Sequence, residues 1–290
     1  MRSYVPRYAL RVAASLDETL ALLAEPGPAW RPFAGGTDLM VLFEAGKLSH
    51  TRYVSLWGLD ALTGILVSDD EVVLRALTTF ADIRAHDVLA AEFPLLGAAA
   101  RETGGIATQN RGTIGGNIAN ASPAADTPPA LLVYDASLDL ISTRGPRRVS
   151  YNTFHTGYKT MDLAADELIA AVRLPRRRPW THQDYRKVGT RRAQAISKVC
   201  FAGALAVEDE LVTDARLAFG SVAPISLRAT SAEAAIRGRR LDAATVAAAE
   251  AALLRDIAPI DDVRSNARYR LMVARNLMKG FLTGVGSTGS

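Results

Sequence analysis

The sequence contains one cysteine, Cys200, in 290 residues. A single thiol cannot form a disulfide within the chain, and a single thiolate cannot hold an iron–sulfur cluster or a structural zinc ion. We therefore expect Cys200 to be buried as a small apolar side chain. The four histidines, at positions 50, 86, 155 and 182, lack the spacing of a metal site. No nucleophile motif accompanies them, so the sequence does not predict catalysis by its own side chains.

Long apolar runs are also missing. None reaches the roughly 18 residues that a membrane-spanning helix needs, and residues 1–7 lack the apolar core of a secretory signal. We expect a cytoplasmic protein without a membrane span. With 49% hydrophobic and 22% charged residues, the composition is that of an ordinary globular chain, and a chain of this length usually divides into two or three parts.

Basic residues exceed acidic ones by four, and many arginines are clustered. The clusters are short and far apart in the chain, and no aromatic stacking motif accompanies them. These features favour solvated turns or a protein–protein surface over a nucleic-acid surface. The clusters are Arg144, Arg147 and Arg148; Arg176, Arg177 and Arg178; Arg191 and Arg192; and Arg237, Arg239 and Arg240.

Two short glycine-rich stretches carry the strongest functional signal. They are Ala34-Gly35-Gly36-Thr37-Asp38 and Thr113-Ile114-Gly115-Gly116-Asn117. Adjacent glycines let successive N–H groups turn toward one anion and let that anion approach, because no Cβ atom stands in the way. A threonine hydroxyl adds another donor. One such stretch alone could be an ordinary tight turn, but two with matching chemistry predict that a dinucleotide pyrophosphate is held from two sides.

The residues around these stretches resemble a known family. Residues 33–40 (FAGGTDLM), with Lys47 downstream, resemble the first flavin motif of the molybdenum-hydroxylase flavoproteins, and residues 112–126 (GTIGGNIANASPAAD) resemble the second. The resemblance continues through 185–192 (YRKVGTRR) and 195–199 (AISKV) and covers nearly the whole chain. This family contains the FAD subunits of carbon monoxide dehydrogenase and bacterial xanthine dehydrogenase.

The resemblance implies an α+β protein with a two-lobed FAD-binding domain of the vanillyl-alcohol-oxidase (PCMH) type and a separate C-terminal α+β domain. We place the two lobes at residues 1–57 and 58–175 and the C-terminal domain at 176–290. The sequence shows no Rossmann-type βαβ alternation. A G-x-G-x-x-G match at 284–289 follows a predicted helix instead of a strand, so it does not indicate a Rossmann site.

Helix-capping patterns fix several predicted elements. Residues 15–18 (SLDE) have the spacing of a capping box for a first helix. Asp242 is placed to cap an alanine-rich helix over 243–254. A last helix is predicted from about 263 to 282, with an apolar stripe at Ala267, Leu271, Ala274, Met278 and Phe281.

The resemblance also assigns positions that contact FAD. The cofactor's pyrophosphate is expected between the two glycine stretches, at Phe33, Ala34, Gly35, Gly36, Thr37, Asp38 and Leu39 on one side and at Thr113, Ile114, Gly115, Gly116 and Asn117 on the other. Because neither stretch contains a histidine or cysteine that could form a covalent link, we expect noncovalent binding.

Four further positions match the family's cofactor site, each with a structural alternative. Asp126 would accept hydrogen bonds from the cofactor's sugar hydroxyls, or it could cap the helix that follows it. Lys187 would lie near the flavin, where a cation stabilises the anionic reduced ring, or it could be a solvated strand lysine. Ile169 and Ile196 would touch the ring system, or they could be ordinary core residues.

The implied partners are a molybdopterin-containing large subunit and a small subunit with 2Fe-2S clusters, from which FAD would pass electrons to NAD or another acceptor. Acidic residues that the eukaryotic xanthine oxidases carry after the arginine pair are replaced here by Gln194 and Ala195, which leaves the acceptor open. Residues 191–192 and 195–199 resemble the bacterial xanthine-dehydrogenase branch more than the carbon monoxide branch, which favours a purine-like substrate for the whole enzyme. Aromatic acyl-CoA, aldehyde and carbon monoxide stay open as substrates. A free-standing FAD-binding protein with a regulatory or assembly role is the alternative function.

Overall fold

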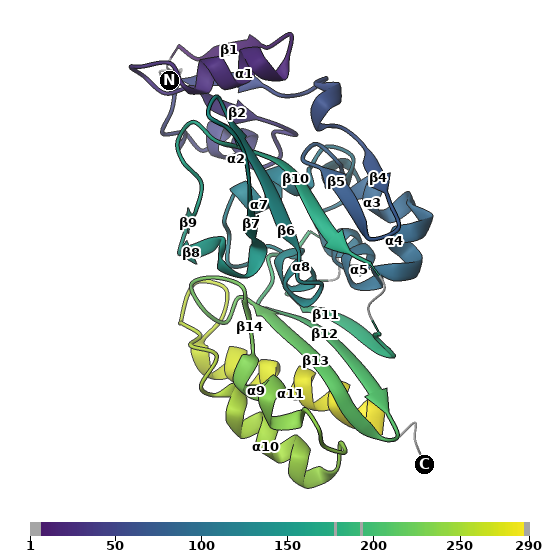
Figure 1. Ribbon diagram of the computed structural model, residues 1–290. Helices are drawn as coiled ribbons and strands as arrows, with labels where there is room; N and C mark the ends of the chain where they lie inside the picture. Colours follow the sequence, from purple (N-terminus) through teal and green to yellow (C-terminus); the bar gives the residue numbers. More distant parts are fainter. Residues whose placement is uncertain (1–6, 177–178, 192–193, 287–290) are drawn as a thin grey trace.

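The computed structural model describes residues 7–176, 179–191 and 194–286. Three parts follow one another along the long axis of the molecule: an N-terminal lobe, a central lobe and a C-terminal domain (Figure 1). Each part has its own main sheet. The boundaries expected near residues 57 and 175 fall between these sheets, because β3 ends at Ser55 and β10 ends at Pro175.

The N-terminal lobe is a three-stranded parallel sheet in the order β1-β3-β2. Its elements are β1 (Ala9–Val12), α1 (Leu16–Leu23), β2 (Arg31–Phe33), α2 (Leu39–Glu44) and β3 (Arg52–Ser55). The Ser15 side chain accepts a hydrogen bond from the Glu18 N–H and caps α1, as predicted. The lobe alternates strands and helices, although the sequence was expected to show no βαβ alternation. Strand β1 gives no sequence pattern, because all four of its residues are exposed. Three strands in this order do not make a Rossmann sheet, so that prediction is confirmed.

The central lobe contains an antiparallel five-stranded sheet in the order β4-β5-β10-β6-β7. Its strands are β4 (Ile65–Val67), β5 (Glu71–Arg75), β6 (Ser137–Ser142), β7 (Gly145–Ser150) and β10 (Leu168–Pro175). Its helices are α3 (Phe80–Ala85), α4 (Asp87–Glu92), α5 (Pro94–Glu102), α6 (Ile106–Gln109), α7 (Ile114–Ala119) and α8 (Pro128–Val133), with two short 3-10 turns, η1 (Asp60–Leu62) and η2 (Tyr151–Thr153). A small hairpin, β8 (His155–Gly157) and β9 (Thr160–Met161), lies near α7 (Figure 1).

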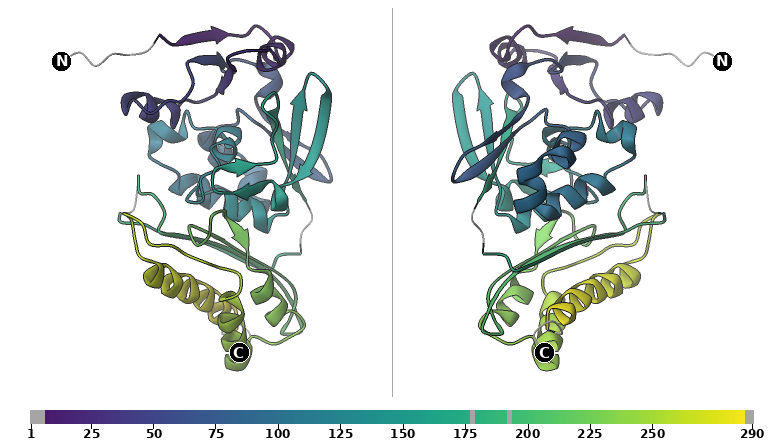
Figure 2. Two further views of the ribbon diagram at one scale, coloured as in Figure 1. Left: turned by 90° about the vertical axis from the view of Figure 1, so that its left-hand side faces the viewer. Right: turned by 90° about the vertical axis from the view of Figure 1, so that its right-hand side faces the viewer.

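The C-terminal domain is an antiparallel sheet covered by three helices. The strands are β11 (His182–Val188), β12 (Val199–Glu208), β13 (Leu211–Gly220) and β14 (Leu227–Arg228), and the helices are α9 (Thr230–Ile236), α10 (Ala243–Leu253) and α11 (Ala267–Gly286). Figure 2 shows these helices on the sheet face that points away from the central lobe.

Two helix predictions in this domain can be compared with the structure. Asp242 caps α10 as predicted, accepting from the Thr245 N–H at 2.7 Å. The last helix begins at Ala267, later than expected, because the Asn266 side chain accepts from the Tyr269 N–H at 2.8 Å and so acts as the N-cap. The Asp261 carboxylate accepts from the Ala267 N–H at 2.5 Å. The G-x-G-x-x-G match begins in the last turn of α11 and continues into residues 287–290, outside the described residues.

Helix α8 joins the central lobe to the C-terminal domain. All six of its residues are buried, and the core cluster around it includes Ala202, Ala204 and Ala218 of the C-terminal sheet. The Tyr134 hydroxyl at the end of α8 donates to Gln183 Oε1 at 2.7 Å and accepts from the Leu95 N–H at 3.0 Å. The two domains therefore share one core.

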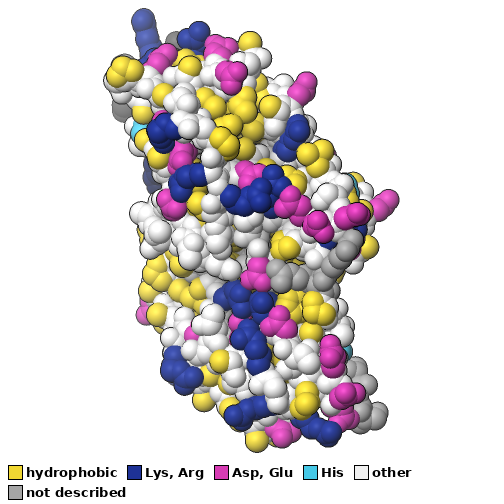
Figure 3. Space-filling view, in the orientation of Figure 1, with side chains coloured by type: hydrophobic (Ala, Val, Ile, Leu, Met, Phe, Trp, Pro, Cys, Tyr) yellow, Lys and Arg dark blue, Asp and Glu magenta, His cyan; other side chains and the backbone are white. Residues whose placement is uncertain are grey.

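Basic and acidic side chains are intermixed on the face shown in Figure 3. Members of the arginine clusters pair with carboxylates: Arg147 with Glu167 at 2.6 Å and Arg176 with Glu92 at 2.6 Å. Arg177, Arg178 and Arg192 lie outside the described residues. In the part of the chain that the structure describes, no helix is both long and apolar enough to cross a bilayer, and no group of three metal-ligating side chains occurs.

Cys200 is fully buried on β12, which confirms the expectation from sequence. Burial raises the pKa of its thiol well above the ordinary range, with the nearby Asp126 carboxylate acting in the same direction.

We predict that Ellman's reagent at pH 8 will not label the Cys200 thiol of the native protein and will label one thiol per chain in denaturant. Rapid labelling of the native protein would show that β12 opens at its Cys200 position.

Candidate functional site

The first glycine stretch is an open loop between β2 and α2. None of the N–H groups of residues 34–39 donates to an acceptor among the described residues. Gly36 has φ +76°, a conformation that turns the backbone sharply and that favours glycine. Thr37 and Asp38 are exposed. Successive free N–H groups in a turned backbone form a concave anion site, so this loop has the chemistry that the sequence predicts for a pyrophosphate.

The second stretch is not an open loop, and this corrects our expectation that its backbone would also donate to the phosphates. Thr113 is the N-cap of α7, and its hydroxyl accepts from the Gly116 N–H at 3.1 Å. The N–H groups of Ile114 and Gly115 donate to Thr78 and Ala76 carbonyls, each at 2.9 Å. These donors are therefore already used within the protein.

Gly115 is needed for packing. A Cβ atom there would lie 2.8 Å from both the Cβ atom and the carbonyl oxygen of Ala76. A larger residue at Gly115 would therefore disturb the packing of α7 against Ala76, whatever it did to a bound phosphate. In contrast, the Asn117 side chain faces the start of α8: its Oδ1 accepts from the Thr127 hydroxyl at 2.6 Å, and its NH2 group has no partner among the described residues.

The two stretches meet in space. A Cβ atom on Gly35 would lie 1.7 Å from the Arg111 carbonyl oxygen, so only glycine allows this approach. The Asn120 Nδ2 donates to Asp38 Oδ1 at 3.2 Å, and Lys159 Nζ donates to the Asn120 carbonyl and side-chain oxygens, each at 2.6 Å. Sequence reasoning identified the loop and α7 but missed Asn120 and Lys159.

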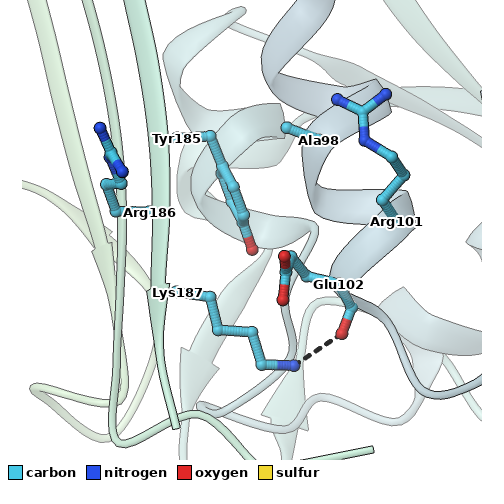
Figure 4. Close-up of a pocket in the computed structure, with 6 residues that line it drawn as sticks. All are labelled: Ala98, Arg101, Glu102, Tyr185, Arg186 and Lys187. Carbon is cyan, nitrogen blue, oxygen red and sulfur yellow. Dashed lines mark hydrogen bonds between the residues drawn. The ribbon is translucent and has the colours of Figure 1, made fainter. Parts of the chain in front are cut away.

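Asp126 and Lys187 form an ion pair between the central lobe and the C-terminal domain. Asp126 Oδ2 lies 2.8 Å from Lys187 Nζ, and Oδ1 accepts from the Ser197 hydroxyl at 2.6 Å. Lys187 Nζ also donates to the Glu102 carbonyl at 2.7 Å (Figure 4). Both side chains are at least nine-tenths buried.

This geometry rules out the structural alternative for each residue, and their cofactor roles stay predictions. Asp126 does not cap α8, because its two oxygens face Lys187 and Ser197, and the residue at the cap position is Thr127. Lys187 is not a solvated strand lysine, because its side chain is only 5% exposed. Burial raises the pKa of Asp126 even though Lys187 and Ser197 act to lower it.

The two isoleucines lie in different surroundings. Ile169 is 4% exposed and belongs to the core of the central lobe, whereas Ile196 is 55% exposed. Ile196 lies in the turn between β11 and β12. Gln194 in the same turn packs against Gly105, where a Cβ atom would lie 2.5 Å from its Nε2. This turn therefore reaches the end of the central lobe near α6.

Two hollows flank the site. A polar one of about 240 Å³ lies between α5 and β11, where Tyr185, Lys187 and Glu102 converge (Figure 4). An apolar one of about 200 Å³ lies beside the first loop and is lined by aromatic and aliphatic side chains including Phe33, Phe43 and Tyr53. Together with the free N–H groups, they give a bound dinucleotide polar and apolar surfaces on the same molecule.

The close approach at Gly35 generates a stability prediction. Gly35→Ala should lower the free energy of unfolding by about 3 kcal/mol, because the new Cβ would overlap a backbone carbonyl that cannot easily shift. Gly280→Ala is the matched control. Nothing lies within 4 Å of a Cβ at Gly280 on α11, so the same change should stabilise by about 0.5–1 kcal/mol through helix propensity. Urea unfolding measures both; a Gly35→Ala variant as stable as the parent chain would contradict the observed contact.

Comparisons with known proteins identify the family of this chain. Residues 6–177 match the family model described as the FAD binding domain in molybdopterin dehydrogenase, and residues 183–285 match the CO dehydrogenase flavoprotein C-terminal domain. The chain is 32% identical to the xanthine dehydrogenase FAD-binding subunit of Escherichia coli O157:H7 over 270 residues, covering 92% of each chain. It is also 32% identical to the glyceraldehyde dehydrogenase medium chain of Sulfolobus acidocaldarius, covering 96% of this chain and 98% of the relative.

A solved structure shows the same fold. Carbon monoxide dehydrogenase from Hydrogenophaga pseudoflava contains a chain that matches this one with a TM-score of 0.92 and 28% identity, over 97% of each chain. The family matches cover both the lobes that carry the glycine stretches and the domain that carries Lys187. The chain therefore belongs to the FAD-binding flavoprotein subunits of the molybdenum-hydroxylase oxidoreductases.

Proposed function

We propose that this chain is the electron-transfer subunit of a heteromeric molybdenum-containing oxidoreductase, and that it binds FAD noncovalently where the first loop meets α7. The observation that carries the proposal is the run of N–H groups over residues 34–39, which have no acceptor among the described residues. A buried or half-buried donor is rarely left without a partner. The pyrophosphate of FAD would supply the missing acceptors.

The proposed cofactor contacts divide between the two parts of the site. On the pyrophosphate side they are the backbone of Phe33, Ala34, Gly35, Gly36, Asp38 and Leu39, the Thr37 hydroxyl, and the α7 start from Thr113 through Ile114, Gly115 and Gly116 to the Asn117 amide. Asp126, Ile169, Lys187 and Ile196 would contact the rest of the cofactor. When bound, FAD supplies the redox chemistry, which no protein side chain here provides.

Lys187 has a specific electrostatic role in this proposal. Two of its three N–H donors bind Asp126 and the Glu102 carbonyl, which leaves one to donate toward the flavin. Two fixed partners hold the Lys187 ammonium in one place and leave its third N–H pointing in one direction. That charge favours the anionic reduced ring over the neutral oxidised one.

The proposed partners follow from the family and from what this chain lacks. Relatives are subunits or medium chains, among them the medium chain of carbon monoxide dehydrogenase and the medium subunit of nicotine 6-hydroxylase. One cysteine cannot ligate a cluster. We infer a large molybdopterin subunit that oxidises substrate and a small subunit whose 2Fe-2S clusters deliver electrons to FAD, with NAD or another molecule as the final acceptor.

The substrate belongs to the large subunit in this proposal. Relatives of equal identity, 32%, come from a xanthine dehydrogenase and a glyceraldehyde dehydrogenase. The motif at 191–199 favours a purine-like heterocycle. An assay of the assembled complex against heterocycles, aldehydes and carbon monoxide tests this choice, and activity on carbon monoxide alone would contradict it.

Cofactor binding gives the first functional prediction. The purified chain should be yellow and should release unmodified FAD when denatured. Thr37→Ala removes one proposed phosphate donor and should weaken FAD binding about fivefold, the worth of one hydrogen bond. Thr283→Ala removes an exposed hydroxyl on α11 that bonds only its own helix, and it should leave the affinity unchanged. Fluorescence titration of the apoprotein measures both; a folded chain that never binds FAD would overturn the proposal.

Assembly gives the second. Affinity purification from the native host should recover a stable heteromeric complex that contains molybdenum and iron. Metal analysis and mass spectrometry of the purified complex check this outcome. A native monomer that reduces an acceptor with an organic substrate unaided would contradict the subunit model and support a free-standing FAD-binding protein.

A further inference from the structure

A buried chain of hydrogen bonds leads from the Asp126–Lys187 pair into the C-terminal domain. The Ser197 hydroxyl donates to Asp126 Oδ1 at 2.6 Å, and the Ser197 carbonyl accepts from the Ser221 hydroxyl at 3.0 Å. The Ser221 carbonyl in turn accepts from the Arg270 guanidinium at 2.8 Å. Ser197 is fully buried, Ser221 is 6% exposed and Arg270 is 3% exposed.

Arg270 is the far anchor of this chain. Its guanidinium also donates to the Lys198 carbonyl at 3.2 Å and pairs with the Asp262 carboxylate at 2.7 Å. Arg270 lies in the first turn of α11. It thereby links the residue just before β12, Lys198, to the residue just after β13, Ser221. A buried guanidinium loses its hydration, so its hydrogen bonds must offset that cost. Both terminal NH2 groups of Arg270 have partners, whereas its Nε has none among the described residues.

Ser221 has an unusual backbone. Its φ is +65°, a left-handed conformation that a non-glycine residue adopts only when its surroundings enforce it. Its N–H donates to the Pro123 carbonyl at 2.8 Å, in the segment just before Asp126. Ser221 therefore connects to Asp126 by two routes, through Ser197 and through residues 123–126.

We propose that Ser221 and Arg270 are positioning residues that hold the Asp126 carboxylate, and through it the Lys187 ammonium, toward the flavin. This inference rests on the proposed function, because it concerns the same cofactor site. Neither residue touches the space between the first loop and α7. Their effect is on the position of the Lys187 ammonium, and so on the balance between oxidised and reduced flavin.

The test measures the midpoint potential of FAD in the full-length chain. Lys187→Met should lower the stability of reduced relative to oxidised flavin about tenfold, a shift of about 30 mV to more negative potential for a two-electron couple. Ser221→Gly removes the hydroxyl and tolerates the left-handed backbone, so it should shift the potential in the same direction by a smaller amount. Arg270→Met should do the same, and Arg270→Lys should restore part of the shift.

Matched controls are present in the same region. Arg264 also pairs with Asp262, at 3.3 Å, but donates to neither carbonyl that Arg270 holds. Ser226 has a buried hydroxyl without a partner among the described residues, close to Ser221 in the β13–β14 connection. Arg264→Met and Ser226→Ala should leave the potential unchanged.

A double variant separates positioning from general stability. If Ser221 acts through Lys187, Ser221→Gly should have no further effect on potential in a Lys187→Met background, although its effect on unfolding should persist. The inference would be overturned if Ser221→Gly shifted the potential equally in both backgrounds. It would also be overturned if Lys187→Met shifted the potential while Ser221→Gly and Arg270→Met left it like that of the parent chain. Failure of the unmodified chain to bind FAD would instead refute the proposed function.

Discussion

The ammonium group of Lys187 is buried, and the rest of the site depends on the carboxylate that pairs with it. A buried ammonium without a partner is strongly destabilising. Its carboxylate partner, Asp126, comes from the other domain, so the pair forms only when the central lobe and the C-terminal sheet are docked. Asp135 at the opposite end of α8 repeats the arrangement by pairing with Arg216 and Arg228.

These pairs make α8 the joint of the molecule. Its six residues are buried, and ionic contacts to the C-terminal domain flank both of its ends. The chain crosses between the domains once near residue 175, but the packing does not separate there, since Ala202, Ala204 and Ala218 belong to the central core cluster. The point where the chain passes from one domain to the next is therefore not a point where the hydrophobic core divides. A cofactor site that uses Lys187 exists only in the assembled pair of domains.

The two glycine stretches show how far local sequence could take the prediction. Thr113 stands three residues before Gly116, which is the spacing of an N-cap, and the structure shows a capped helix. Thr37 follows its glycines, so it cannot cap by that pattern, and the loop stays open. By composition the two stretches look like equivalent phosphate loops, and that is the prediction made from the sequence. The order of residues contained the distinction.

Some other features of the structure can be predicted from local sequence patterns, and others cannot. The caps at Ser15 and Asp242 and the burial of Cys200 needed only nearby residues or composition. Strand β1 was missed because every residue in it is exposed and no alternation marks it. The contact between Ser221 and Arg270 joins residues 49 positions apart. No single-sequence pattern specifies such a pairing, because it depends on how β13 and α11 pack.

The proposed cofactor would meet two different kinds of electrostatics on this protein. At the first loop the donors are backbone N–H groups; the loop's own side-chain charge, Asp38, is negative, and the Lys159 ammonium lies beyond it on Asn120. Binding a pyrophosphate at that place relies on oriented dipoles, so it depends on the backbone geometry that Gly35 and Gly36 permit. At Lys187 the protein presents a full charge fixed by side chains from two domains. In this proposal affinity comes mainly from the loop, and control of the redox balance comes from the docked interface, so a domain without a phosphate-binding motif would still contribute to the cofactor site.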